Sequence, residues 1–191
     1  MHALAPPKKI LTVDDNAIVS ADVRSILEAA GYDVCPEARD GVQALEHVRQ
    51  YEPDLILLDL KLPRMDGVEA ASLIRQQSDA PILVLTGYDD SEMLARAEAA
   101  GTSGLVLKPF SEHGLLSAVR TRLAQRDSED FGLRCMVESM LRDGADEETI
   151  VRTLRATTGA GDNRTRAHGR TTGLRRIARA LTRRRARSAA A

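Results

Sequence analysis

The first two-thirds of the chain alternate short apolar runs with longer stretches in which apolar residues recur every three or four positions. The short runs predict buried strands, and the longer amphipathic stretches predict helices. The five predicted strands are Lys9–Val13, Tyr32–Cys35, Leu55–Asp59, Ile82–Leu85 and Leu105–Leu107. Residues 55–58 are apolar at every position, which indicates a central strand covered by helices on both faces. We therefore expect an α/β fold with a doubly wound, five-stranded parallel sheet.

The predicted helices between these strands begin at polar residues that can cap them. The candidate caps, in chain order, are Asn16, Asp40, Asp66, Asp89 or Asp90, and Ser111. Gly31 and Gly101 follow the first and fourth helices, and glycine is the usual residue just past a helix end.

The strand pattern stops after Arg126, so we predict a first domain of residues 1–126. Apolar residues at helical spacing then predict a helical hairpin over residues 127–158. Its apolar positions are Leu133, Met136, Val137, Met140 and Leu141, followed by Ile150, Val151 and Leu154. Residues 159–191 are typical of an Arg-rich linker and a short amphipathic helix, partly disordered. A small all-α region with a basic tail is thus expected after the α/β domain.

Acidic and basic residues are segregated along the chain, although the net charge is only −1. Residues 159–191 contain ten arginines and one acid, which leaves 17 basic and 27 acidic residues in the first 158. A basic tail attracts polyanions such as nucleic acid or an anionic membrane surface.

No apolar run is long enough to cross a bilayer, and no secretory signal is recognised at the start of the chain. We therefore expect a cytoplasmic protein. Cys35 and Cys135 lie far apart and the four histidines are scattered, so neither set predicts a metal cluster. Both cysteines are expected to act as small apolar side chains.

Polar residues lie at or just beyond the carboxyl ends of four predicted strands: Asp14 and Asp15, Asp59, Thr86, and Lys108. The carboxyl ends of parallel strands meet at one edge of the sheet, which is where ligands bind in such folds. Three carboxylates at one edge repel each other unless a cation lies among them, and oxygen ligands suit Mg²⁺. A magnesium site is therefore predicted. Helix capping is an alternative for the first two acids, although Asn16 can serve that purpose.

A carboxylate beside Mg²⁺ can act as a nucleophile toward phosphorus, as in aspartyl-phosphate enzymes. Lys108 supplies a positive charge and Thr86 a hydroxyl donor, so each could bind a different phosphoryl oxygen. These residues are the groups needed to hold an acyl phosphate.

Four motifs at these strand ends resemble the signature of the receiver (CheY-like) domain of two-component response regulators, which has a flavodoxin-like fold. They are Val13-Asp14-Asp15-Asn16, the segment 58–67 (Leu-Asp-Leu-Lys-Leu-Pro-Arg-Met-Asp-Gly), Leu85-Thr86-Gly87 and Lys108-Pro109-Phe110. The resemblance covers about the first two-thirds of the chain. It implies phosphorelay signal transduction, with a sensor histidine kinase as the partner and Mg²⁺ as the cofactor.

The resemblance assigns a role to each site residue. It implies that Asp59 is the phosphoacceptor and that Asp14 and Asp15 are the Mg²⁺ acids, with the backbone carbonyl of Lys61 and Asp59 as further ligands. It also implies that Thr86 moves toward the phosphoryl group and that Lys108 neutralises its charge. In the family, the peptide bond before Pro109 is cis. The chain would be no enzyme beyond self-catalysed phosphotransfer and autodephosphorylation.

One position departs from the family pattern. Receivers commonly have an aromatic residue three positions before the lysine, and this chain has Leu105 there. A leucine has less area to bury and no polar atom, so the switch that couples Thr86 to this position would be differently built. In the family, the face formed by the fourth helix, fifth strand and fifth helix commonly serves dimerisation or partner docking, so the resemblance implies a homodimer or a docking partner at this face.

Residues 127–191 resemble no standard output domain, and two interpretations of their output function stay open. The Arg-rich end favours nucleic-acid binding and transcription regulation. The methionine-containing stripe of the predicted hairpin would serve a protein-interaction or oligomerisation module without sequence-specific DNA binding if it packs on a partner or a second copy. The alternative for this stripe, which we expect, is packing on its own neighbouring helix. A third class, a metal-dependent phosphohydrolase, would need a second acid two residues after the nucleophile, where this chain has Lys61.

Overall fold

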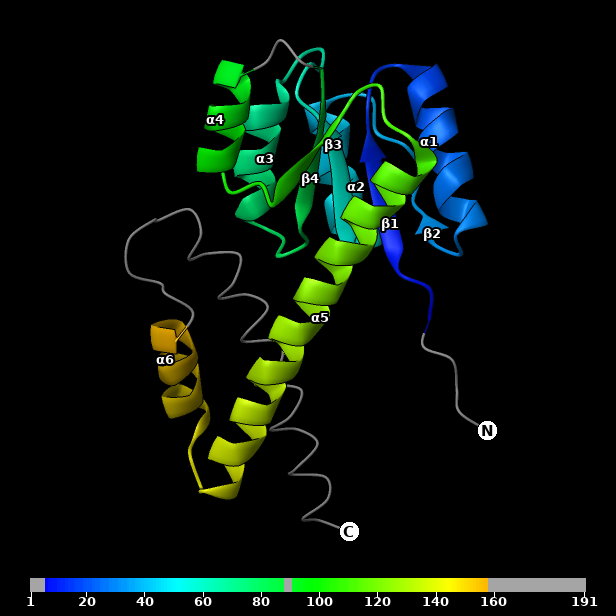
Figure 1. The fold of residues 1–191 in the computed structure, drawn as a ribbon. Helices are drawn as coiled ribbons and strands as arrows, with labels where there is room; N and C mark the ends of the chain where they lie inside the picture. The colour runs from blue at the N-terminus through cyan, green and yellow to red at the C-terminus, as the bar shows by residue number, and fades with distance from the viewer. Residues whose placement is uncertain (1–5, 88–90, 158–191) are drawn as a thin grey trace. The chain divides into compact units, whose positions relative to one another are not determined.

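The computed structural model describes residues 6–87 and 91–157. Strands and helices alternate as far as residue 142, and one more helix follows (Figure 1). The strands are β1 (Lys9–Val13), β2 (Asp33–Val34), β3 (Leu55–Asp59), β4 (Ile82–Thr86) and β5 (Gly104–Leu107). The helices are α1 (Ala17–Ala29), α2 (Gly41–Tyr51), α3 (Gly67–Arg75), α4 (Ser91–Ala99), α5 (Glu112–Arg142) and α6 (Glu147–Thr157).

All strand pairs in the five-stranded sheet are parallel, and their order is β2-β1-β3-β4-β5. The predicted doubly wound α/β fold is therefore confirmed. Strand β2 is two residues shorter than predicted, because this edge strand makes only two residue pairs with β1. Strands β4 and β5 are each one residue longer than predicted, since Thr86 and Gly104 join the ladder between them.

Helices cover both faces of the sheet, which explains why its central strands are apolar at every position. Apolar residues of α1 and of the first part of α5 pack on one face. Those of α2, α3 and α4 pack on the other. Figure 1 shows α1 and α3 on opposite sides of the strands. The sheet is thus held between two hydrophobic cores, and its carboxyl edge is left as the place where polar groups can gather.

The strand register brings the predicted site residues together at this edge. Val13 pairs with Leu58, so the residues that follow them, Asp14 and Asp59, leave adjacent strands at the same level. Thr86 pairs with Leu107 in the same way, one residue before Lys108. The strand order reverses between β1 and β3, and this switch point is where ligands bind in doubly wound sheets.

Four of the predicted helix caps are confirmed. The side chains of Asn16, Asp40, Asp66 and Ser111 each accept a hydrogen bond from a backbone N–H in the first turn of the helix that follows. The fifth prediction, Asp89 or Asp90, lies outside the described residues.

Helix α5 differs from the prediction, which began a separate helix beyond Arg126. It continues without a break from Glu112 to Arg142. The residues on both sides of Arg126 include no proline, and Gly132 is tolerated at a modest cost within a helix. Among the described residues, the chain divides into two compact units: 6–74 with 80–124, and 75–79 with 125–157. The domain boundary at residue 126 stays a prediction.

In the second unit, the end of α5 packs against α6. Val137 and Leu141 of α5 form a small core with Ile150 and Leu154 of α6. Leu133, Met136 and Met140 pack against this core, so the methionine-containing stripe contacts its own neighbouring helix. The Arg-rich segment 159–191 lies outside the described residues.

The two cysteines lie in different environments. Cys35 is buried, as expected, but Cys135 is exposed on α5. The expectation was wrong for Cys135 because the helix turns about 100° per residue, which puts it on the opposite side from buried Val137. None of the helices in the described part of the chain has the length and apolar composition that crossing a membrane requires.

Candidate functional site

Three carboxylates meet at the carboxyl edge of the sheet. Asp14, Asp15 and Asp59 each offer an oxygen atom, and these oxygens lie within 4.8 Å of one another. Asp14 is buried, Asp15 is exposed and Asp59 lies between these extremes. The structure therefore brings the three predicted acids together, with one side of the cluster open to solvent.

The loop after β1 holds Asp14 at several points. Its Oδ1 accepts a hydrogen bond from the backbone N–H of Asn16 at 2.9 Å, and its own N–H donates to the carbonyl of Ala38 at 3.0 Å. The Ser20 hydroxyl donates to the Asp14 carbonyl at 3.4 Å. Asn16 caps α1, so the start of this helix and the buried acid are positioned together.

Asp59 is fixed by the loop that follows β3. Its Oδ1 accepts a hydrogen bond from the backbone N–H of Lys61 at 3.0 Å. Gly67, the first residue of α3, lies against the Asp59 backbone, since a Cβ atom at Gly67 would be 2.2 Å from the Asp59 carbonyl oxygen. Gly67 thus shapes the loop, because no larger residue fits there.

Lys108 joins two of the carboxylates. Its ammonium donates to Asp14 Oδ2 at 2.7 Å and to Asp59 Oδ2 at 2.5 Å. Burial by itself would lower the pKa of Lys108, but the hydrogen bonds that Lys108 donates to Asp14 and Asp59 outweigh it, so this pKa lies above its ordinary value. Lys108 is therefore a fixed positive charge at the site. The Lys108–Pro109 peptide bond is cis, as the resemblance implied.

Thr86 lies at the end of β4 and is buried. Its hydroxyl donates to the carbonyl of Gly87 at 3.2 Å. The backbone of Lys108 donates to the Thr86 carbonyl at 2.7 Å, which ties the ends of β4 and β5 together. The predicted hydroxyl thus lies at the carboxyl edge of the sheet.

The acidic cluster fits a hard divalent cation. Carboxylate oxygens are the ligands that Mg²⁺ prefers, and Mg²⁺ keeps several waters, for which the exposed Asp15 side leaves room. No histidine or cysteine belongs to this group among the described residues, so the donors do not suit zinc. Asp14, Asp15 and Asp59 would hold the ion. The predicted role of the Lys61 carbonyl stays a prediction.

Two residues near the site were not assigned to it from the sequence. Arg64, in the loop between β3 and α3, forms an ion pair with Asp40, the cap of α2. The sequence identified Asp40 as a cap only. No local motif indicates the pair, because its partners are 24 residues apart.

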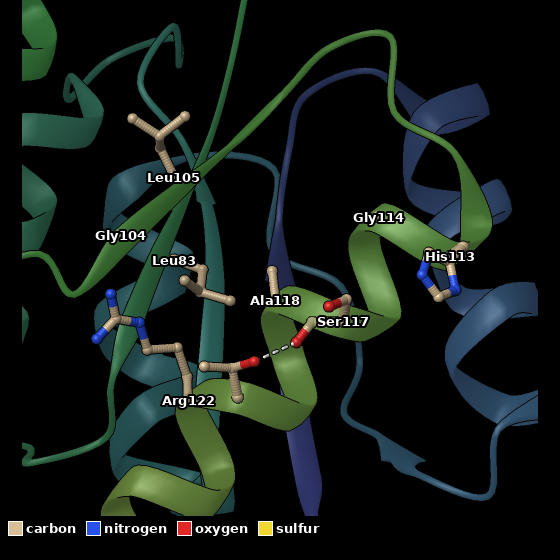
Figure 2. A pocket seen from close by; sticks show the side chains of 9 residues that line it. Leu83, Gly104, Leu105, His113, Gly114, Ser117, Ala118 and Arg122 are labelled. Carbon is tan, nitrogen blue, oxygen red and sulfur yellow. Dashed lines mark hydrogen bonds between the residues drawn. The ribbon is translucent and has the colours of Figure 1, made fainter.

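A hollow of about 390 Å³ lies between β5 and α5 and shares no lining residue with the acidic cluster. Figure 2 shows Gly104 and Leu105 of β5 on one side, with Ser117 and Arg122 of α5 on the other. The side chain of Leu105 is 48% exposed. The position that is commonly aromatic in receivers is therefore occupied by an exposed leucine at the edge of this hollow.

Comparison with known proteins identifies the first part of the chain. Residues 10–120 match the model of the response regulator receiver domain. Over 121 residues the chain is 36% identical to the transcriptional regulatory protein PdtaR of Mycobacterium tuberculosis, covering 63% of this chain and 59% of PdtaR. Over 122 residues it is 37% identical to the DNA-binding response regulator MtrA of Mycobacterium leprae, covering 64% and 54%. The chain thus aligns with little more than half of each of these relatives.

Solved structures show the same fold. The chemotaxis protein CheY4 of Vibrio cholerae is 34% identical, with a TM-score of 0.58, and the match covers 61% of this chain and 98% of CheY4. The receiver domain of a sensor histidine kinase from Pseudomonas aeruginosa, whose structure has a magnesium ion coordinated in the active site cleft, is 29% identical. Its TM-score is 0.58, with 62% and 98% covered. From the residues matched and the position of the acidic cluster, we conclude that this chain belongs to the response regulator receiver domain family of two-component signalling.

Proposed function

We propose that this chain accepts a phosphoryl group on Asp59 from a sensor histidine kinase, in a Mg²⁺-dependent reaction in the cytoplasm. The observation that carries the proposal is the cluster of three carboxylates whose oxygens lie within 4.8 Å, with Lys108 bonded to two of them. The magnesium ion in the related receiver from Pseudomonas aeruginosa supports the choice of metal.

In the proposed transfer, a carboxylate oxygen of Asp59 attacks the phosphorus atom of a phosphohistidine. An O–P bond forms as the N–P bond breaks, and the imidazole leaves with the electron pair and takes a proton from solvent. When bound, Mg²⁺ supplies positive charge that stabilises the phosphoryl oxygens in the transition state. No other substrate is turned over, and later attack by water on the acyl phosphate returns Asp59 to its starting state.

Lys108 and Thr86 would then bind oxygen atoms of the phosphoryl group on Asp59. Lys108 exchanges its bond to Asp59 for one to a phosphoryl oxygen, which draws the end of β5 with it. Thr86 releases the carbonyl of Gly87 and donates to a second phosphoryl oxygen. Both movements change the surface that includes Leu105, and their effect is a shift of population between two conformers. In the receiver family, residues at the positions of Lys61 and Tyr88 flank the site, and Tyr88 lies outside the described residues.

The test is incubation of the purified chain with acetyl phosphate, a small phosphodonor, and with Mg²⁺ or EDTA. Phosphorylated protein is resolved on a phosphate-affinity gel. We expect a retarded band that needs Mg²⁺ and is absent in Asp59→Asn. The matched control is Asp54→Asn, immediately before β3 and far from Asp59 along the strand, where an asparagine can still accept the hydrogen bond from the Lys9 backbone. A retarded band in Asp59→Asn would contradict the proposal.

For the output, we propose regulation of transcription through nucleic-acid binding by the basic segment 159–191. Its ten arginines support this proposal, as do the names of the relatives PdtaR and MtrA, a transcriptional regulatory protein and a DNA-binding response regulator. The alternative is a protein-interaction output, such as a homodimer through the face formed by α4, β5 and α5. The exposed Leu105 beside the hollow on that face favours this alternative.

A titration against duplex DNA at two salt concentrations, with and without phosphorylation, separates these outputs. Site-selective binding that persists at the higher salt supports a transcription regulator. Loss of all binding with salt, together with a phosphorylation-dependent increase in mass by light scattering, supports the homodimer.

A further inference from the structure

The loop between β3 and α3 is attached to the start of α2 by two consecutive residues. Arg64 has a left-handed backbone, with φ of 68°, which costs free energy for any residue other than glycine. Its guanidinium forms an ion pair with Asp40. Next to it, Met65 lies against Gly41, since a Cβ atom at Gly41 would be 2.7 Å from the Met65 sulfur. The loop therefore has a specific docking place on α2.

Asp40 is a rigid acceptor for this contact. Its side chain is 4% exposed, whereas that of Arg64 is 60% exposed. Asp40 Oδ1 accepts the backbone N–H groups of Val42 and Gln43 at 2.9 and 3.0 Å, and Oδ2 accepts from Arg64. Because the buried Asp40 carboxylate is also held by the first turn of α2, it is a fixed acceptor for Arg64, and the loop takes its position from the helix.

The same loop orients the proposed phosphoacceptor. The backbone N–H of Lys61 donates to Asp59 Oδ1 at 3.0 Å, and that of Gly67 donates to the Leu60 carbonyl at 2.9 Å. The loop thus begins at the Asp59 carboxylate and returns to the Asp59 backbone, with Arg64 near its middle. A displacement at Arg64 would be transmitted to Lys61 and so to the Asp59 oxygen.

From this juxtaposition we propose that Arg64 and Asp40 are positioning residues for the metal and phosphoacceptor site, in which their ion pair holds the loop that sets the direction of the Asp59 carboxylate. The inference rests on the proposed function of Asp59. Neither residue touches the reacting atoms, and their effect is exerted through Lys61 and Asp59. Groups that orient a metal ligand from the second layer commonly change metal affinity by about 10- to 100-fold when removed.

The experiment measures Mg²⁺ binding by calorimetry in the absence of any phosphodonor, and in parallel the rate of phosphorylation by acetyl phosphate. The variants are Arg64→Gln, Asp40→Asn and the double substitution. Asparagine caps a helix about as well as aspartate, so Asp40→Asn removes the charge and keeps the cap of α2. Arg49→Gln, an exposed arginine in the last turn of α2, is the matched control.

We expect Arg64→Gln and Asp40→Asn each to weaken Mg²⁺ binding by about tenfold, with no further loss in the double variant, because both remove the same contact. Arg64→Lys, which keeps the charge, should recover part of the affinity. Affinities within twofold of the wild type, or losses that multiply in the double variant, would overturn the inference. Thermal unfolding of each variant shows whether it is folded, and a variant that unfolds early is measured below its transition.

The two proposals fail in different ways. If the wild type binds Mg²⁺ but takes no phosphoryl group, the proposed function of Asp59 is wrong, and the Mg²⁺ titration still decides the role of Arg64. If the wild type is phosphorylated and Arg64→Gln behaves like Arg49→Gln in both measurements, the positioning role alone is wrong.

Discussion

Replacement of Lys108 by methionine should make the stability of the receiver unit depend strongly on Mg²⁺. Without metal, the Lys108 ammonium is the cation bonded to both Asp14 and Asp59. Methionine keeps most of the apolar stem and removes the charge, so the carboxylates then repel each other without compensation. Added Mg²⁺ would supply the positive charge that Lys108 supplies in the wild type.

The size of the effect can be worked from the geometry. At 2.7 and 2.5 Å, each charge pair has a gross attraction of about 6 kcal/mol at an effective dielectric constant of about 20. Desolvation offsets most of it, because the three side chains are only 22%, 0% and 13% exposed. Removing one partner of a buried pair costs about 3 to 5 kcal/mol. Since Lys108 keeps some contact with water, we expect a loss of about 3 kcal/mol in the unfolding free energy without metal.

The assay is urea unfolding of wild type and Lys108→Met in EDTA and in increasing Mg²⁺, with calorimetry for the affinity. The ammonium no longer competes for Asp14 and Asp59, so we expect Mg²⁺ to bind the variant about tenfold more tightly, which is about 1.4 kcal/mol. At saturating metal, the variant then regains more unfolding free energy than the wild type.

The matched control is Lys9→Met, an exposed lysine at the start of β1, which should show the Mg²⁺ response of the wild type. Competition between Lys108 and Mg²⁺ is refuted if Mg²⁺ stabilises Lys108→Met no more than it stabilises the wild type, or if the variant binds the ion more weakly.

Four further outcomes are expected. Burial would raise the pKa of Asp40, but its hydrogen bonds outweigh this and lower it. The ionised Asp40 carboxylate therefore stabilises the fold fully above the ordinary carboxyl pKa of about 3.9, and this stabilisation is lost as the pH falls through the lower pKa of the folded state. In Asp40→Asn, the unfolding free energy measured by urea titration should therefore fall less steeply below about pH 4. Gly67→Ala should cost about 3 kcal/mol in the same assay, because the new Cβ would collide with the Asp59 backbone. No atom lies within 4 Å of a Cβ atom added at Gly132. Gly132→Ala should therefore stabilise α5 by about 0.8 kcal/mol, measured as slower exchange of the α5 backbone amide hydrogens. Ile18 is 81% exposed in the first turn of α1, close in the chain to Asp14 and Asp15. We expect it to contact the kinase. Ile18→Ser should therefore slow phosphoryl transfer from the phosphorylated kinase about tenfold and leave transfer from acetyl phosphate unchanged.

The fold and the acidic cluster could be predicted from the sequence because both depend on strand ends. Strands β1 and β3 were predicted at their observed bounds, since their apolar runs are bounded by polar residues. A parallel sheet then requires that Asp14 and Asp59, although 45 positions apart, lie at one edge. Only the chain order and the apolar pattern are needed for that inference.

The features of the fold and site that could not be predicted depend on contacts between distant residues, which leave no local pattern in the sequence. The pair of Arg64 and Asp40 joins two loops, and either residue alone is an ordinary surface charge or helix cap. The continuity of α5 was missed because the apolar face used by the sheet ends at Leu123, and a new face begins at Leu133. The sequence between them is polar, but it contains nothing that would stop a helix.

The register of β1 against β3 has a consequence for how the site can be lost. Asp14 and Asp59 are neighbours only while Val13 is paired with Leu58, and a slip by one pair would shift one strand by about 3.3 Å and reverse its faces. Asp14 and Asp59 therefore cannot keep their spacing once the central strands separate. Binding of Mg²⁺ should disappear at the same urea concentration as the strand amides lose protection, so the ion can serve as a reporter of cooperative unfolding in this chain.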